Sequence, residues 1–563
     1  MVAALALLLD VLGVAMAVVV TVTTVAGPWS ILVGGHLLRV RSTGNLIAGC
    51  LLLALLRGLV PAPPILGLRA WSLANVRRGA AAGLEALSRR LDVVDARTAL
   101  RVVGILVLIA SAIRVANVFT HFGFITGDDV EIHEMTLGVA LGRAWPVWDL
   151  RNAFYPMTFV FPVQRALVAL GVTDVFSLVA AGRLVVTAIA GLNIWILYRV
   201  GLSTYGDRGT ALIAAALLAA NHLHMTYGSA ELPRIVATAF LVPAFGALRT
   251  PTPLRCALAG VLLGLGASLR FGEIVFAVPA LVSVLQGSPA DAGAAPWRVR
   301  LTQAPVVLAA MAATILVVIG VSDALYWGRP FHSLLAIVDY TLVQRLSSRG
   351  YEPPWYYLAH VTDWSNVLLV VLAGLAWRRT RRSVLLWAAL PLALLSVLPH
   401  KEARYAIATI PFWALAAAPT LRSWLARGEV RAPGIVHARL GALGIALLVA
   451  AALAFDAGKF RFVRSEAAVR LGRTMERSAS GLAAEQLWRF GGHLYLDRAT
   501  PLVDLDPQQP DTLIRDACRA EMRWAAIRLG PHLKPAASVL RRCGFVAGPT
   551  ALEAGYQLFR RHP

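Results

Sequence analysis

Long apolar runs separated by short polar segments dominate this chain from residue 102 to residue 455. A transmembrane helix needs roughly 20 mostly apolar residues, and several of the runs approach that length. The runs lie near 102–124, 175–198, 209–226, 235–248, 254–269, 273–286, 303–322, 364–377, 384–398, 406–421 and 438–455. The pattern therefore predicts a polytopic α-helical membrane protein.

Two further apolar runs, 8–34 and 46–66, precede this region and predict an extra pair of spans. With them the chain has about 11–13 predicted transmembrane helices. Residues 69–101 hold seven arginines and are typical of an amphipathic segment on the inner membrane surface. We therefore divide the chain into an N-terminal region (1–100), a transmembrane catalytic domain (101–455) and a soluble domain (456–563).

Polarity rises after residue 456, and the pattern there predicts a small α/β domain. We expect a helix over 466–488, short strands at 493–497, 502–505 and 524–529 and a helix over 536–543, followed by a last segment at 556–560. Cys518 and Cys543 both lie in this domain, and they can form a disulfide if the domain is extracytoplasmic. Cys50 and Cys256 lie in apolar runs and are expected to be core residues.

The arginine distribution sets the predicted orientation. If the run at 102–124 points outward, the inside loops carry 14 arginines and three acidic residues, whereas basic and acidic residues nearly balance in the outside loops. The positive-inside rule favours this arrangement. The soluble domain then lies outside the cytoplasm, and the apolar N-terminus is expected to be embedded rather than cleaved.

Composition excludes other classes of protein. The chain is 58% hydrophobic and only 15% charged, whereas soluble domains carry about 25% charged residues. Its net charge of +22 is spread between apolar runs, as in the cytoplasmic loops of membrane proteins, so we expect no binding to nucleic acid.

The first predicted outer loop starts with a cluster of carboxylates, Asp128, Asp129, Glu131 and Glu134, with His133 among them. Adjacent carboxylates raise one another's pKa, so one member of such a pair is suited to accept a proton. We predict that Asp128 or Asp129 is a catalytic base, and the sequence leaves the choice open. The alternative is a solvated acidic turn.

A second cluster, His400, Lys401, Glu402 and Arg404, lies between two apolar runs. Charges at bilayer depth are costly, so the cluster indicates function more than simple capping of a helix end. If the segment is helical, His400 and Arg404 share one face. We predict that His400, Lys401 and Arg404 bind an anion such as phosphate and that Glu402 orients its basic neighbours.

Other polar and aromatic residues of the outer loops complete the candidate site. Aromatic rings beside carboxylates can bind a sugar, although an interfacial aromatic belt has the same composition. The sugar-binding or acceptor-binding candidates are Asp323, Tyr351, Trp355 and Tyr356, and the supporting candidates are Glu134, Arg234 and Arg270. His222 and His224 diverge on a helix, and no metal-type spacing of cysteines occurs, so we predict no metal site there.

The run His-Lys-Glu-x-Arg-Tyr at 400–405, followed by Pro411, resembles the hallmark motif of glycosyltransferase family 22. These enzymes are lipid-phosphate-mannose-dependent mannosyltransferases of N-glycan and GPI-anchor pathways, with the GT-C fold. The family's acidic pair resembles Asp128-Asp129, although members usually have Asp-Glu there. Weaker similarities are the elements at 323–328 and 351–357 and the positions of Arg234 and Arg270.

The resemblance implies an inverting membrane mannosyltransferase with its site on the outer face. The bias toward arginine and alanine indicates a bacterial relative, and hence a bacterial inner membrane. The implied donor is a polyprenyl-phosphate sugar, and the acceptor is a lipid-linked or cell-envelope glycan. We predict no obligatory cofactor, because the basic cluster can stabilise the lipid phosphate, although the acidic pair could also bind a divalent metal. Two alternatives remain: a transporter or flippase of lipid-linked sugars, and a GT-C enzyme for another sugar such as arabinose or a hexosamine.

Overall fold

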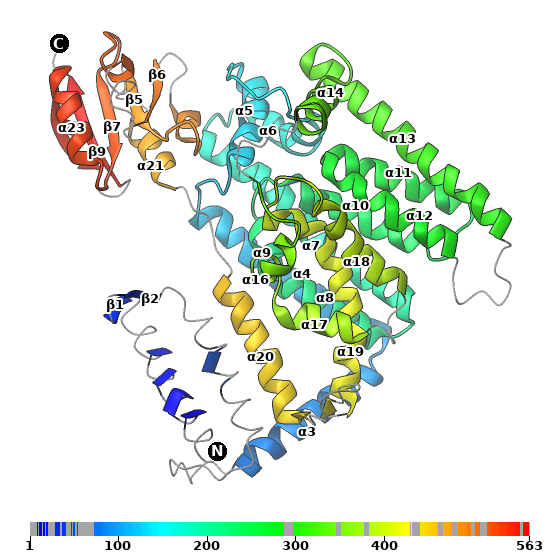
Figure 1. Cartoon of the computed structure of the whole chain (residues 1–563). Coiled ribbons are helices and arrows are strands. Elements are labelled where there is room, and N and C mark those ends of the chain that lie inside the picture. The colour runs from blue at the N-terminus through cyan, green and yellow to red at the C-terminus, as the bar shows by residue number, and fades with distance from the viewer. Residues whose placement is uncertain are drawn as a thin grey trace.

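The protein is mostly helical, and a helix lies on each of the eleven apolar runs between residues 102 and 455 (Figure 1). The computed structural model describes residues 73–286, 297–344, 351–376, 382–427, 429–430, 440–459, 466–475, 481–496, 501–506, 515–551 and 555–561, with short segments before residue 73. The helices on the runs are α4 (Ala96–Thr120), α7 (Val175–Tyr205), α8 (Arg208–Ala220), α10 (Pro233–Ala247), α11 (Pro253–Leu269), α12 (Ala277–Gln286), α13 (Trp297–Trp327), α17 (Val367–Leu375), α18 (Arg382–Leu395), α19 (Ile410–Arg427) and α20 (Ala442–Lys459).

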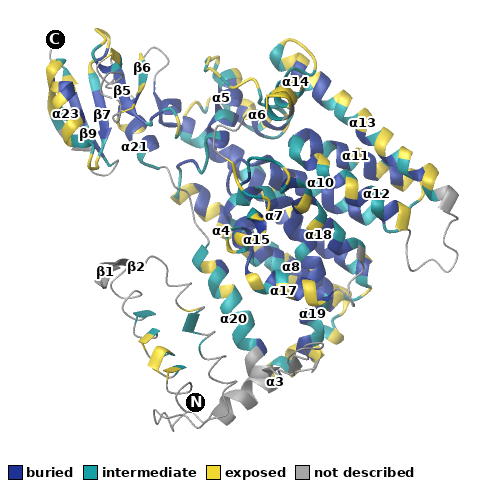
Figure 2. Ribbon diagram, viewed as in Figure 1, coloured by how far each residue is buried: buried dark blue, intermediate teal, exposed yellow. Residues whose placement is uncertain are grey.

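Three helices within the described ranges, α4, α7 and α13, are long and apolar enough to cross a membrane, and several shorter apolar helices accompany them. One side of α13 exposes large apolar residues, including Leu316, Val317 and Leu325 (Figure 2). A contiguous apolar surface of this kind is unfavourable in water and favourable against lipid. The chain is therefore an integral membrane protein.

Close helix packing in the core depends on small residues. Gly260 and Gly264 of α11 face α13, where an added Cβ at Gly260 would lie 2.4 Å from the Val307 carbonyl oxygen. The small-xxx-small spacing lets two backbones approach, which is how helices pack where no hydrophobic effect drives them together.

The amphipathic segment expected near residues 69–101 contains α3 (Leu73–Asp92), which contacts α19 and α20. Most of the two N-terminal runs lies outside the described residues. Where the span 8–34 was expected to be helical, residues 29–33 instead form strand β1 (Trp29–Val33), which pairs with β2 (His36–Val40) in an antiparallel hairpin. In Figure 1, α3 lies at the opposite end of the helical bundle from α5 (Gly127–Leu141).

The C-terminal region contains a five-stranded sheet in the order β6-β5-β7-β9-β8. The strands are β5 (Leu482–Glu485), β6 (Leu502–Leu505), β7 (Trp524–Arg528), β8 (Phe545–Ala551) and β9 (Tyr556–Arg561); β5, β6 and β7 are parallel, and β9 is antiparallel to both β7 and β8. Helices α21 (Glu466–Met475) and α23 (Leu533–Arg542) accompany the sheet. A small C-terminal α/β domain was expected, and this sheet fits it.

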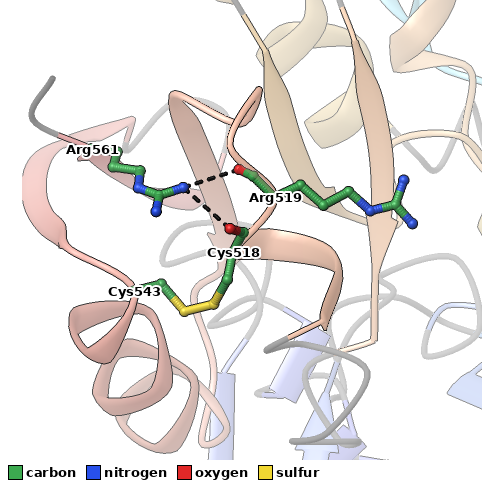
Figure 3. Close-up of a disulfide and its surroundings, with 4 residues drawn as sticks. All are labelled: Cys518, Arg519, Cys543 and Arg561. Carbon is green, nitrogen blue, oxygen red and sulfur yellow. Dashed lines mark hydrogen bonds between the residues drawn. A yellow bond between two sulfur atoms is a disulfide. The ribbon is translucent and has the colours of Figure 1, made fainter.

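Three details of the C-terminal prediction were wrong. The helix expected over 466–488 ends at Met475, and residues 482–485 of that range form strand β5 instead. The strand expected at 493–497 is the 3₁₀ helix η6 (Gly492–Tyr495), and β8 was missed. Cys518 and Cys543 form a disulfide that ties the turn before β7 to the end of α23 (Figure 3). Arg561 Nη1 donates to the carbonyl oxygen of Cys518 at 3.3 Å beside this bond.

Candidate functional site

Helix α5 begins with a capping box that uses Asp129. The Asp129 backbone N–H donates to the Thr126 hydroxyl at 3.4 Å, and the Asp129 carboxylate accepts from the backbone N–H groups of Thr126 and Ile125, each at 3.2 Å. The Thr126 hydroxyl also donates to Asp129 at 3.0 Å. Both Asp129 oxygens are therefore occupied by the turn that starts the helix.

The environment of Asp129 disfavours its charged form. The residue is fully buried, and burial, followed by the negative charge of Glu231, raises the pKa of Asp129 to about 7. The Arg404 guanidinium acts in the opposite direction and is outweighed. Asp129 is thus a capping residue that holds a proton more readily than an ordinary aspartate.

Asp128, by contrast, faces three arginines from three separate segments. Its Oδ1 accepts from Arg151 Nη2 at 2.8 Å, and its Oδ2 lies 3.0 Å from Arg404 Nη1 and 3.6 Å from Arg270 Nη2. We call Arg151, Arg270 and Arg404 the arginine cluster. The sequence predicted that the acidic and basic motifs meet, and Asp128 and Arg404 do lie in contact.

Two further carboxylates balance the arginine cluster. Glu131 pairs with Arg151, and Glu402 pairs with Arg404. Burial lowers the pKa of Arg404, but the charges of Asp128 and Glu402 outweigh burial, so the net shift is upward. The formal charges of the three arginines and the three carboxylates balance, so an anion can bind the arginine cluster only by displacing a carboxylate from it.

The segment before Arg404 is not helical, so the condition under which His400 and Arg404 would share a helix face is not met. Glu402 has an extended backbone, and the 3₁₀ helix η5 (Ala403–Thr409) begins only after it. His400 Nε2 lies 3.1 Å from Glu402 Oε1 and therefore points along the chain rather than sharing a helix face with Arg404. The His400 ring also meets the Tyr405 ring edge to face at 5.9 Å.

Lys401 binds backbone, not the arginine cluster. The side chain is buried, and Nζ donates to the carbonyl oxygens of Glu352 at 2.7 Å and Leu398 at 2.5 Å. A backbone hydrogen bond from Glu352 to the Pro399 carbonyl, 3.0 Å, joins the same two segments. In this conformation Lys401 fastens the 351–353 segment to the loop that carries Arg404.

The supporting residues fall into different places. Arg234 pairs with Glu273, and its guanidinium lies 4.4 Å from the centre of the Tyr405 ring. Arg234 therefore packs against η5, which contains Tyr405. Arg270 belongs to the arginine cluster. Glu134 lies away from the cluster, beside His493 of the C-terminal domain.

The sugar-binding candidates are also separated. Asp323 is fully buried and accepts from the Ser333 N–H and hydroxyl at 2.8 and 2.7 Å, which caps α14 (His332–Val338). Tyr351 and Trp355 are 72% and 61% exposed. Tyr356 stacks on His360 with ring centres 4.3 Å apart. The structure thus gives Asp323 a structural contact and leaves Tyr351 and Trp355 available at the surface.

Sequence reasoning missed Arg151, which contacts both Asp128 and Glu131. The signal for it was charge balance, because the 125–174 loop holds four carboxylates at its start and only three arginines. It also missed the buried contacts of Glu231 with His133 Nε2 and Arg183 Nε, each at 2.6 Å, behind Asp129. No pattern local to α5 indicates a partner about 100 residues later.

Among the described residues, no group of three or more His, Cys, Asp or Glu side chains is arranged to hold a metal ion. The absence of an obligatory metal stays a prediction. The chemistry that the described groups can perform is acid–base transfer at Asp128 and anion binding by the arginine cluster.

The family model described as the Alg9-like mannosyltransferase family matches residues 143–475. Two crystal structures of ArnT from Cupriavidus metallidurans are similar in fold. The one bound to undecaprenyl phosphate has a TM-score of 0.55 at 12% identity, and the apo structure has 0.53 at 14%; each comparison covers 82% of this chain and 99% of ArnT. No curated protein sequence matches significantly. At these identities the structural likeness shows the GT-C fold alone.

Proposed function

Because the chain belongs to the Alg9-like mannosyltransferase family, we propose that this membrane glycosyltransferase moves mannose from a polyprenyl phosphate to an extracytoplasmic glycan. The acceptor is a lipid-linked or cell-envelope glycan at the outer face of a bacterial inner membrane. The contact of Asp128 with three arginines carries the proposal, since it puts a base beside a site for a phosphate leaving group.

We assign the base to Asp128. Both oxygens of Asp129 are occupied by the helix cap, whereas Asp128 faces groups that can exchange partners. When the donor phosphate takes up the arginine nitrogens, the Asp128 carboxylate is released to accept a proton from the acceptor hydroxyl. This exchange would couple donor binding to activation of the acceptor.

In the reaction, Asp128 takes the hydroxyl proton while the acceptor oxygen forms a bond to the anomeric carbon. The bond between that carbon and the phosphate oxygen breaks, its electron pair leaves with the polyprenyl phosphate, and the configuration inverts. Arg404, Arg151 and Arg270 stabilise the charge that develops on the leaving phosphate, and the bidentate geometry of arginine suits this role.

We propose that the arginine cluster, rather than Lys401, binds the phosphate, because Lys401 donates to backbone carbonyl oxygens. Lys401 donates to two carbonyl oxygens and so holds the segment that carries Arg404. We propose that Lys401 positions the arginine cluster and that the contacting pair His400 and Glu402 lies at the outer side of this cluster. Tyr351 and Trp355 remain our candidates for contact with a sugar ring because they are exposed.

The test is transfer from radiolabelled undecaprenyl-phosphate mannose to membrane glycans of a strain lacking this gene, with purified protein in nanodiscs. The wild type should transfer mannose, Asp128→Asn should transfer it at least about 100-fold more slowly, and Asp129→Asn should keep transfer well above that residual rate. Undiminished transfer by Asp128→Asn would refute the assignment of the base. Transfer from undecaprenyl-phosphate arabinose instead of mannose would keep the fold and mechanism and change the sugar.

A further inference from the structure

Helix α5, which carries Asp128, is buried on two sides by two different parts of the chain. Ile132 packs in the transmembrane core. Val130 and Leu137 pack in a second cluster that contains Val469 of α21 and Leu494 of η6. The catalytic helix is therefore held between the membrane domain and the C-terminal domain, and Figure 1 shows α21 on the side of that domain toward α5.

A buried polar contact joins the same two parts. Glu134 Oε1 lies 2.8 Å from His493 Nε2, and the two residues are 3% and 1% exposed. The His493 ring stacks on Trp488 with centres 4.1 Å apart and planes 2° apart, and Trp145 meets it edge-on at 6.1 Å. The histidine thus packs between two tryptophan rings with Nε2 within contact distance of Glu134 on α5.

Two more contacts make this junction tight. Arg143, just after α5, donates from Nη1 to the Leu494 carbonyl oxygen at 3.2 Å. Gly491 has a φ of +75°, and a Cβ added there would lie 2.5 Å from the Phe124 ring. The Gly491 backbone of the C-terminal domain therefore lies against the Phe124 ring, just before the first outer loop, with no room for a side chain at residue 491.

The spacing along α5 links the junction to the base. Glu134 follows Asp128 by six residues, which is roughly 9 Å along a helix axis. A change in the tilt of α5 at Glu134 therefore also moves Asp128. The contacts of Asp128 with the arginines are 2.8 to 3.6 Å long, so a small displacement of Asp128 would break them. Misplacement of a reacting group by about 1 Å can lower a rate by roughly 100-fold.

We propose that His493 is a positioning residue that acts through Glu134 to hold Asp128 against the arginine cluster. The described residues from 466 to 496 are then part of the catalytic unit rather than a cover over it. This inference rests on the proposed function, because it concerns how the base is placed.

The experiment compares Glu134→Gln, His493→Gln and the double variant in the full-length protein in nanodiscs. Mannose transfer from undecaprenyl-phosphate mannose gives kcat and the donor KM, and binding of undecaprenyl phosphate counts the competent sites. Each single variant should lower kcat per site by about 10- to 100-fold with the donor KM within about threefold. The double variant should be no more than about threefold slower than the slower single one, because both changes remove one contact.

His532→Gln is the matched control. His532 Nε2 lies 3.0 Å from Glu485 Oε2, a histidine–glutamate contact of the same kind in the same domain, where neither partner belongs to the clusters that touch α5. It should leave kcat per site within about twofold of wild type. A merely structural role for His493 would reduce the number of sites and leave kcat per site unchanged, and that result would overturn the proposal.

A third comparison separates this inference from the proposed function. In an Asp128→Asn background, His493→Gln should lower kcat no further, since it acts through Asp128. A further tenfold loss would show a different role for His493. If wild type transfers no mannose, or if Asp128→Asn transfers normally, the proposed function fails first; if only the His493 variants are normal, the positioning role alone fails.

Discussion

Replacing Asp128 with asparagine should greatly slow transfer, leaving only a residual rate, and at the same time tighten the binding of undecaprenyl phosphate. The asparagine keeps the size of the side chain but removes its negative charge and its ability to accept a proton. Loss of a general base lowers a rate by roughly 100- to 10,000-fold. Opposite effects on rate and binding are the signature that distinguishes this arrangement from simple loss of structure.

The size of the binding effect follows from the site. Arginine nitrogens lie 2.8 to 3.6 Å from the Asp128 oxygens. A phosphate held by the same nitrogens would lie roughly 5 Å from Asp128, where two unit charges repel by about 3 kcal/mol at an effective dielectric constant of 20. The Asp128 side chain is only 8% exposed, so water screens little of this repulsion, but the positive charges of the neighbouring arginines offset part of it. We expect about half to be recovered, which is roughly a tenfold lower Kd.

The assay measures transfer of labelled mannose alongside binding of undecaprenyl phosphate to the same nanodisc preparation. Removing one partner of a buried ion pair destabilises a protein by about 3–5 kcal/mol, so melting is recorded with and without the lipid phosphate. Arg404→Ala is the contrasting variant and should weaken binding. If Asp128→Asn weakens binding as much as Arg404→Ala does, the idea that carboxylate and phosphate compete for the arginines is wrong.

Three other predictions follow from single contacts. Burial and a neighbouring glutamate raise the pKa of Asp129 from 3.8 to about 7, so the folded state keeps this proton to a higher pH than the unfolded state does. The unfolding free energy of wild type relative to Asp129→Asn should therefore fall between about pH 4 and about pH 7 and then level off, as measured by thermal melts. Lys401→Met should lower the melting temperature and increase proteolysis at residues 351–353. It should weaken binding of undecaprenyl phosphate less than Arg404→Ala does, and equal losses would contradict the backbone role. Serine at both Cys518 and Cys543, which close a loop with a separation of 25 residues, should cost about 3 kcal/mol in unfolding of the C-terminal domain, and non-reducing mass spectrometry should find the linked peptides only in wild type.

The helices could be predicted because each apolar run is a local signal. Every run between residues 102 and 455 coincides with a helix, since a membrane-spanning segment must satisfy its own backbone hydrogen bonds. The same argument failed at His400 and Lys401, where the local pattern allowed a helix. Neither residue lies in a helix, the backbone of Glu402 is extended, and Lys401 binds a carbonyl 49 residues earlier in the chain, which no local rule indicates.

The candidate site shows the same division. The proximity of Asp128 and Arg404 followed from topology, because both motifs were predicted on the outer side. The separation of roles between Asp128 and Asp129 did not, because it depends on which carboxylate the turn at Thr126 captures. The contact of Glu134 with His493 joins residues 359 positions apart, and only the folded chain reveals it.

The close approach of Gly491 to Phe124 has a consequence for chimeric enzymes. Exchanging the C-terminal domain between relatives replaces only one side of its interface with the membrane domain. The other side, which includes Phe124, Leu137 and Arg143, remains that of the recipient. A graft that ignores those three positions should express and insert normally but turn over slowly. A chimera should therefore take these three residues from the same relative as its C-terminal domain.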